Sequence, residues 1–262
     1  GLGDVYKRQI KWSLGSLAKK GKLKEPPGAV LDRIRPTTRL EEAGEADYVI
    51  EAVVEKTEVK KEVFSKLDQF ARPEVVFATN TSTIPISDLA GATSRPDKFI
   101  GLHFMNPPVL MPLVEIIMGD ETSEETLRTT VELAKSIGKD YVLVKKDVPG
   151  FLVNRLNMRT FSEGLRMLEE GFSKEELDAM VRFRLGWPMG ICELLDFVGL
   201  DVVYFACNEM VRRGFQLEVP DILREMVEQG KLGMKSGEGF YKYPKPGAYV
   251  RPAVVPTDRM YE

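Results

Sequence analysis

Apolar positions in the first half of the chain alternate between short runs and a helical spacing. Residues 47–54 (DYVIEAVV) form an apolar run whose short length is typical of a buried strand in a parallel sheet. Apolar side chains three or four residues apart predict a helix over residues 57–70, and residues 75–78 form a second apolar run. Strand, helix and strand in this order predict a right-handed βαβ unit.

Two further strands are expected over residues 99–104 and 113–118, on either side of a proline-containing turn. If they pair antiparallel about that turn, His103 and Glu115 face each other across the two strands. A helix and a strand within residues 123–144 complete this α/β part of the chain.

The pattern changes to helices alone after Pro149 and Gly150. Helical periodicity runs over residues 151–170, and Ser173 with Glu176 forms the capping box that begins the next helix. We therefore expect a domain boundary near Asp147. The expected division is a sheet domain over residues 10–147, an all-helical domain over 148–243, and a tail or linker over 244–262.

The first residues of the chain differ from the rest. Residues 10–20 show a short amphipathic helix, whereas residues 1–9 (GLGDVYKRQ) contain no initiator Met and fit no element. They resemble translated sequencing-adapter read-through, as found at the ends of assembled metagenomic genes, and are excluded from the fold prediction. We expect the natural protein to begin earlier than this chain.

Composition indicates an ordinary globular protein. The 262 residues are 43% hydrophobic and 29% charged, with a net charge of −3, which suits one large domain or two modest ones. This near-neutral charge argues against nucleic acid or an anionic membrane as the main partner, and no apolar run approaches the ~18 residues of a membrane span. We expect Cys192 and Cys207 to be free thiols in a reducing cytoplasm.

His103 is the first candidate for chemistry because it is the only histidine in the chain. A lone histidine is more often a structural residue than a catalyst. Here, however, a carboxylate at Glu115 would hold the imidazole in one tautomer and stabilise the imidazolium that forms after proton abstraction. The pair therefore predicts a general base at the end of a strand.

Other polar residues leave alternatives open when each is considered alone. Asn80-Thr81-Ser82-Thr83 follows a buried strand, at the sheet edge where ligands bind, yet a polar turn that caps the next helix explains it equally well. Asn154 near the start of helix 151–170 is most simply an exposed helix residue. Glu55 and Lys60 are either solvated charges or groups that bind the ribose and phosphates of a dinucleotide.

Several long stretches, taken together and in order, closely resemble the 3-hydroxyacyl-CoA dehydrogenase family of β-oxidation and butanoate metabolism. The resemblance covers roughly residues 10–245, so its signal is much stronger than that of one short motif. The matching stretches are VIEAVVEK (49–56), ATNTSTIPIS (78–87), IGLHFMNPP (100–108), LVEII (113–117), KDVPGFLVNR (146–155), GWPMGICELLDFVGLD (186–201) and KLGMKSGEGFYKY (231–243).

The resemblance implies a fold and a reaction. The fold is α/β: a truncated Rossmann-type doubly wound parallel sheet domain, followed by an all-helical C-terminal domain. The implied reaction is the NAD-dependent oxidation of an (S)-3-hydroxyacyl-CoA to a 3-ketoacyl-CoA. The family's residue roles carry over to His103 as catalytic base, Glu115 as its orienting partner, and Ser82 and Asn154 as the groups that bind the C3 oxygen. Family positions that contact the cofactor match Glu55, Lys60, Asn80, Ser82, Asn106 and Lys235, and those that touch coenzyme A match Ser13 and Lys20.

One part of the family pattern is not found among these residues. Family members begin with a strand, a Gly-rich turn and a helix that bind the pyrophosphate of NAD, and no G-x-G-x-x-G occurs in this chain. The acidic residue that distinguishes NAD from NADP belongs to the same part. We expect the chain as written to have an open sheet edge, to fold marginally, and to show weak NAD binding and little activity.

The resemblance also suggests partners and leaves two alternatives. It implies a homodimer through the helical domain, and residues 243–256 resemble the connector to a further helical module and an enoyl-CoA hydratase domain. Another β-hydroxyacid dehydrogenase is one alternative, but such enzymes typically use a lysine on the helix where Asn154 stands. A non-catalytic relative, such as a lens crystallin, is the other. The intact set of Ser82, His103, Glu115 and Asn154 argues against it.

Overall fold

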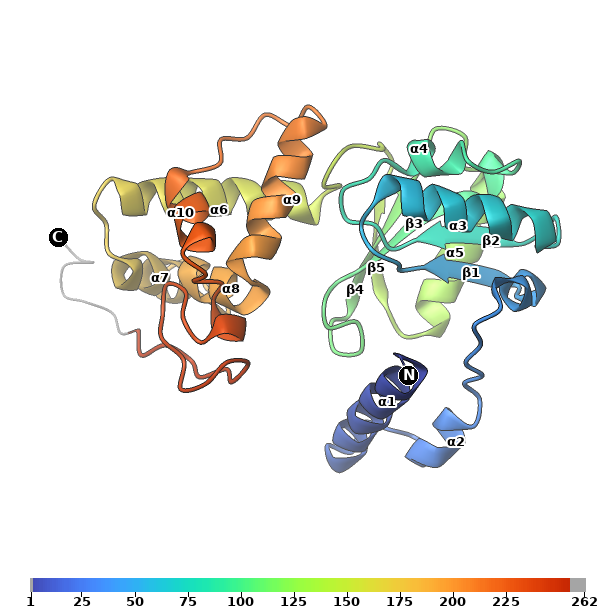
Figure 1. Ribbon diagram of the computed structural model, residues 1–262, viewed down its shortest axis with the longest axis horizontal. Helices are drawn as coiled ribbons and strands as arrows, with labels where there is room; N and C mark the ends of the chain where they lie inside the picture. Colours follow the sequence, from blue (N-terminus) through green and yellow to red (C-terminus); the bar gives the residue numbers. More distant parts are fainter. Residues whose placement is uncertain (1, 255–262) are drawn as a thin grey trace.

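The computed structural model describes residues 2–254 of the chain, with side chains from residue 6 onward. A sheet with its covering helices forms one part and a bundle of helices forms the other (Figure 1). Two helices at the start of the chain, α1 (Leu2–Lys19) and α2 (Pro27–Leu31), pack against each other beside the sheet. Short 3-10 helices are η1 (Leu40–Glu45), η2 (Pro96–Lys98) and η3 (Met234–Ser236).

The sheet has five strands in the order β1-β2-β3-β4-β5. β1, β2 and β3 run parallel, β4 is antiparallel to β3, and β5 is parallel to β4. The register places His103 opposite Glu115, as the sequence predicted. The strands are β1 (Tyr48–Glu51), β2 (Val76–Thr79), β3 (Phe99–Phe104), β4 (Leu113–Met118) and β5 (Asp140–Val144).

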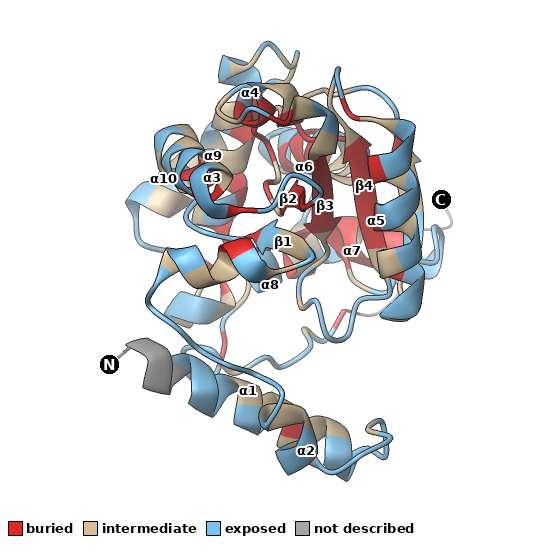
Figure 2. Ribbon diagram, turned by 90° about the vertical axis from the view of Figure 1, so that its right-hand side faces the viewer, coloured by how far each residue is buried: buried red, intermediate tan, exposed pale blue. Residues whose placement is uncertain are grey.

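Helices cover both faces of the sheet, which fits its parallel, mostly buried strands (Figure 2). On one face, α3 (Thr57–Phe70) and α4 (Ile86–Ala90) pack on alternate strand residues such as Phe77 and Phe99. On the other face, α5 (Glu124–Ser136) packs on Ile100 and Leu102. The helices over residues 57–70 and after Ser123 confirm the sequence prediction.

β1 differs from its prediction. The sequence predicted a buried strand over residues 47–54, but the strand ends at Glu51, and Val53 and Val54 are 40% and 61% exposed. Within residues 2–254, β1 pairs with β2 alone, which makes it an edge strand, and Ile50 on it is 42% exposed. An apolar run predicts a strand, but burial of that strand also depends on neighbouring elements, which the run itself does not specify.

The helical part has its own core. Its helices enclose buried side chains such as Leu177, Leu195 and Val203. Ser173 and Glu176 form the expected capping box, and Cys192 and Cys207 are buried free thiols, as predicted. The helices are α6 (Val153–Glu169), α7 (Lys174–Phe183), α8 (Ile191–Val198), α9 (Leu200–Arg212) and α10 (Asp221–Glu228).

Both ends of the described chain are more ordered than the sequence suggested. Helix α1 begins at Leu2, so the expectation that residues 1–9 fit no element is wrong for residues 2–9, since an established helix extends at little cost. The expected tail is also anchored: the Tyr249 hydroxyl donates to Glu193, and Arg251 donates to the Pro188 carbonyl. Residues 255–262 lie outside the described residues. No helix within the described part is long and apolar enough to cross a membrane.

Candidate active site

His103 and Glu115 form a buried pair at the carboxyl end of β3. The imidazole Nδ1 lies 2.7 Å from Glu115 Oε2, and the two residues are 7% and 0% exposed. An ionised carboxylate only accepts hydrogen bonds, so Nδ1 carries the proton and donates it to Glu115. The other ring nitrogen, Nε2, is left with its lone pair, which makes it the atom that accepts a proton.

Glu115 also fixes the start of the helical part. Its second oxygen, Oε1, accepts the backbone N–H groups of Leu152 and Val153, each at 2.9 Å. These groups begin α6, where the helix dipole favours a negative charge. One carboxylate therefore holds the imidazole on the sheet and the first turn of the bundle at the same time.

The turn before α6 places an aromatic ring against the imidazole. Gly150 has φ +77°, a backbone conformation that strains any L side chain, and a Cβ there would press on the end of the Met210 side chain. Phe151 follows with φ +49°, is 1% exposed, and its ring lies edge-on to His103 with centroids 5.8 Å apart. The predicted helix over residues 151–170 starts at Val153 because of this left-handed turn.

Ser82 contacts His103 on the sheet part, and Asn154 contacts Ser82 from the helical part. The Ser82 hydroxyl oxygen lies 3.0 Å from His103 Nε2, and its proton fits the free lone pair there. The Asn154 amide donates to the backbone carbonyl of Ser82 at 3.5 Å. The loop after β2, which carries Ser82, therefore lies against the first turn of α6, which carries Asn154.

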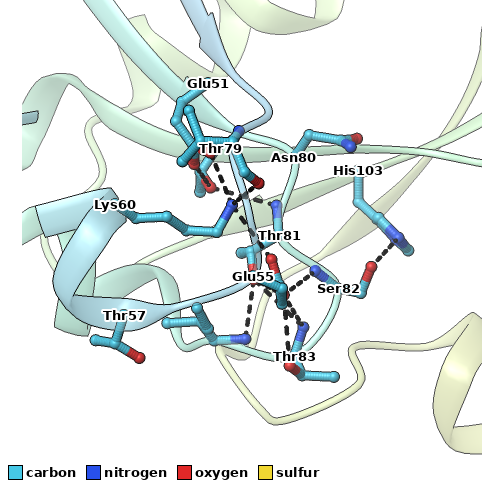
Figure 3. A network of polar contacts seen from close by, with 12 residues as sticks. Glu51, Glu55, Thr57, Lys60, Thr79, Asn80, Thr81, Ser82, Thr83 and His103 are labelled. Atoms are coloured by element: carbon cyan, nitrogen blue, oxygen red, sulfur yellow. Dashed lines mark hydrogen bonds and ion pairs between the residues drawn. The ribbon is translucent and has the colours of Figure 1, made fainter. Parts of the chain in front are cut away.

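Glu55 organises the loop that carries Ser82 (Figure 3). Its Oε1 accepts the Ser82 N–H at 2.9 Å, the Thr83 N–H at 3.3 Å, and the Thr81 hydroxyl. Partial burial favours a higher pKa for Glu55, but the hydrogen bonds from Thr81 and Ser82 and the charge of Lys60 outweigh it and lower that pKa. The carboxylate is therefore held ionised at neutral pH.

Lys60 is buried behind Glu55 instead of being solvated. Its ammonium donates to Glu51 at 2.7 Å, lies 3.2 Å from Glu55, and reaches the Val53 carbonyl at 3.4 Å. The Thr79 hydroxyl donates to Glu51 at 2.7 Å, which completes the network that Figure 3 shows. Removing either charge of the buried pair Lys60 and Glu51 would leave the other uncompensated. The pair therefore stabilises the loop after β1 that carries Glu55.

A cavity of about 710 Å³ opens beside this network. On the sheet side it is lined by residues at the ends of β1 and β2, including Val53, Glu55 and Asn80, whose side-chain oxygen accepts the Phe104 N–H at 2.8 Å. On the other side it is lined by α9, including Val202 and Phe205. The cavity lies at the carboxyl ends of parallel strands, where α/β proteins bind their ligands.

The remaining predicted site residues lie elsewhere. Asn106 is exposed on the loop after β3, and Lys235 is ion-paired with Asp201, the second residue of α9, at 2.5 Å. Ser13 and Lys20 are on and just after α1, which both ribbon views show beside the main body of the molecule. The contacts of Ser82, His103, Glu115 and Asn154 involve none of these four residues.

Some site residues were not found from the sequence. Glu51 and Thr79 belong to the hydrogen-bonded network behind Glu55, and Phe151 packs on His103. A carboxylate inside an apolar run, as at Glu51, is a signal that could have been used, since a buried charge needs a partner. Phe151 gave no such signal, because an apolar residue is ordinary in a folded chain.

The residues present fit the nicotinamide end of a dinucleotide. An ionised carboxylate, an amide and an apolar wall lie together at the edge of the parallel strands. No Gly-rich turn for a pyrophosphate occurs within residues 2–254. The same residues contain no group of three or more His, Cys, Asp or Glu side chains placed to hold a metal ion.

This fold and this site define a nicotinamide-dependent dehydrogenase built from a sheet part and a helical part. The NAD-binding domain of 3-hydroxyacyl-CoA dehydrogenase matches residues 4–148, and the C-terminal domain of the same family matches residues 150–243. The chain belongs to the 3-hydroxyacyl-CoA dehydrogenase family. It is an oxidoreductase that uses NAD.

Similar proteins support this assignment over most of the chain. A probable 3-hydroxybutyryl-CoA dehydrogenase of Deinococcus radiodurans is 44% identical over 92% of this chain and 87% of its own. The crystal structure of (S)-3-hydroxybutyryl-CoA dehydrogenase from Ralstonia eutropha has a TM-score of 0.85 at 37% identity, over 91% of this chain and 85% of its own. A fatty acid oxidation complex subunit alpha of Psychrobacter is 40% identical over 93% of this chain but 35% of its own length.

Proposed function

We propose that His103 is the general base of the reaction, in which a 3-hydroxyacyl-CoA is oxidised with NAD to a 3-ketoacyl-CoA. The oxidation itself follows from membership of the family. The observation that supports the role of His103 is its pairing with Glu115 through Nδ1, which leaves the Nε2 lone pair facing Ser82. The substrate hydroxyl would donate its proton to Nε2.

The charge that forms on His103 is balanced within the protein. After proton transfer the imidazolium lies against the carboxylate of Glu115, which is buried and cannot be screened by solvent. A bound NAD would supply the hydride acceptor for C3. The hydroxyl of Ser82 and the amide of Asn154 would hold the C3 oxygen, and they come from the two sides of the cleft.

The proposed cofactor contacts fall into two groups. Glu55 and Asn80 line the cavity, and we propose that they contact the nicotinamide and its ribose directly. Lys60 also borders the cavity but is 1% exposed, so it supports this end of the site through Glu55. Asn106 and Lys235 are exposed side chains of the loop after β3 and of η3, and we propose that they contact the cofactor from outside the cavity.

The pH dependence of the two reaction directions tests the role of His103. The base must be neutral to accept the proton during oxidation, and protonated to return it during reduction of a 3-ketoacyl-CoA. We therefore expect kcat/KM to rise with pH in the oxidation and to fall with pH in the reduction, in step. Profiles that change in the same direction would contradict a single proton-transfer group.

The remaining proposals concern partners and location. We propose that Ser13, half-buried on α1, and Lys20, exposed just after it, bind the coenzyme A portion. We also propose that residues 148–243 form the domain through which two chains pair. Exposed apolar side chains on the bundle, including Phe172 at 51% and Leu185 at 62%, support pairing, which sedimentation equilibrium would test. We also propose a cytoplasmic location. A fused hydratase domain is supported by the similarity to the complex subunit of Psychrobacter, and sequencing beyond residue 262 would test it.

A further inference from the structure

Arg213 connects the helical part to the sheet part through its side chain. It follows the last residue of α9, and its Nε donates to Glu209 on that helix at 2.6 Å. Its Nη2 donates to the Thr57 hydroxyl at 3.2 Å, and its Nη1 lies 3.7 Å from the Asp88 carboxylate. Thr57 begins α3 and Asp88 lies in the first turn of α4, so both partners belong to the sheet part.

The position of this contact is at the rim of the cavity. The face of α9 that lines the cavity carries Val202, Phe205 and Glu209, spaced three and four residues apart as one helical stripe requires. The facing wall includes Glu55 and Thr57. Because Arg213 joins Glu209 to Thr57, it fixes the distance between these two walls.

Among residues 2–254, the other hydrogen bonds between the two parts lie near the covalent connection. Leu152 and Val153 donate to Glu115, and Asn154 donates to the Ser82 carbonyl, all within the first turn of α6. Arg213 lies far along the chain from this turn and is 13% exposed in its side chain. Two separated attachments restrain rotation between two bodies, whereas one attachment leaves a hinge.

We propose that Arg213 is a positioning residue that holds the two walls of this cavity together over the bound nicotinamide cofactor. The proposal rests on the function given above, because this cavity is the one proposed to receive the nicotinamide and its ribose. A substrate that binds the closed form binds more weakly when that form is less populated, in proportion to the lost fraction. Arg213 thus contributes to KM without touching the reacting atoms.

The first test is the variant Arg213→Gln, assayed with acetoacetyl-CoA and NADH. We expect KM for NADH to rise about fivefold, the change that the loss of one ordinary hydrogen bond produces, while kcat stays within about twofold. Arg224→Gln is the matched control, since Arg224 forms its ion pairs to Asp221 and Glu228 within α10 alone. An unchanged KM in Arg213→Gln, or an equal rise in the control, would overturn the proposal.

The second test measures the separation of the two parts without turnover. Nitroxide labels on cysteines that replace Lys66 on α3 and Glu163 on α6 report one interdomain distance, and both positions are exposed, at 56% and 65%. The native cysteines are buried and do not compete for the label. Arg213→Gln should broaden the distance distribution, and Arg224→Gln should not. A distribution unchanged by Arg213→Gln refutes the closing role, whereas broadening in a protein whose His103→Gln variant turns over as fast as its parent refutes the proposed function alone.

Discussion

Replacing Glu115 by Gln should slow turnover while leaving the fold nearly intact. The glutamine oxygen can still accept the N–H groups of Leu152 and Val153, so the start of α6 keeps its hydrogen bonds. The amide nitrogen then faces His103 and donates to Nδ1. This moves the ring proton to Nε2, and the imidazole loses the lone pair that accepts the substrate proton.

The size of the effect follows from the lost charge. Two unit charges about 4 Å apart interact by about 4 kcal/mol at an effective dielectric constant of about 20, and Glu115 is fully buried beside the imidazole. A loss of about 4 kcal/mol in the transition state corresponds to a fall in kcat of about 10³-fold. The free energy of unfolding should fall by about 1 kcal/mol, because the variant keeps the hydrogen bonds at the start of α6 but loses the negative charge that interacts with the helix dipole.

The assay is NADH oxidation at saturating acetoacetyl-CoA, with urea unfolding measured in parallel. Glu132→Gln on α5 is the matched control, because Glu132 is an exposed carboxylate on the same sheet part. KM should stay within about twofold in both variants, since Glu115 reaches the substrate only through His103. Turnover of Glu115→Gln within threefold of the parent would refute the argument that the carboxylate sets the tautomer and the charge.

Three other residues give further predictions. Ser82→Ala should lower kcat/KM by about 10–10²-fold in the same assay, because one hydrogen bond to the C3 oxygen is lost, and a normal value would contradict its role. Glu55→Gln should have a lower free energy of unfolding than the parent at neutral pH. This difference should shrink as the pH falls below about 4.3 and through the lowered pKa of Glu55, because the parent then loses the same charge. Urea unfolding at several pH values measures it, and a pH-independent difference would contradict the prediction. Asp196→Ala should lower the free energy of unfolding by about 3–5 kcal/mol, because the buried N–H groups of Phe240 and Tyr241 and the Tyr243 hydroxyl lose their acceptor; a change within 1 kcal/mol would refute this.

The sequence predicted those parts of the fold that depend on neighbouring residues. The register that brings His103 to Glu115 follows from the number of residues in one connection between two strands, so it could be derived. The helix over residues 57–70 and the capping box at Ser173 are likewise local patterns. Each of these predictions depends on chain geometry within a few turns or one hairpin.

Other features depend on contacts between distant segments. The second task of Glu115, which accepts the N–H groups at the start of α6, depends on where the helical part docks. Lys60 would be placed in solvent by its charge, but Glu51, which Thr79 of the neighbouring strand β2 holds by a hydrogen bond, offsets the cost of its burial. The edge position of β1 and the hydrogen bond from Tyr249 to Glu193 also depend on segments far away in the sequence, which no local pattern predicts.

The described residues supply contacts for only one end of NADH. The cavity supplies groups for the nicotinamide end, whereas no Gly-rich turn occurs within residues 2–254. A site that binds only the nicotinamide half of a dinucleotide lacks the contacts to its pyrophosphate, so we expect its affinity for NADH to be low. The site around His103 is nevertheless complete in its own hydrogen bonds, so the role of the imidazole can be judged by comparing variants with their parent.

The most direct test of that role is kcat of His103→Gln, measured as acetoacetyl-CoA-dependent NADH oxidation beside the parent protein. Gln keeps a polar group of similar reach but has no lone pair on a basic nitrogen. We predict a fall in kcat of about 10²–10⁴-fold, the usual weight of general acid–base catalysis, with the affinity for acyl-CoA unchanged. A kcat within tenfold of the parent would contradict the assignment of His103 as the base.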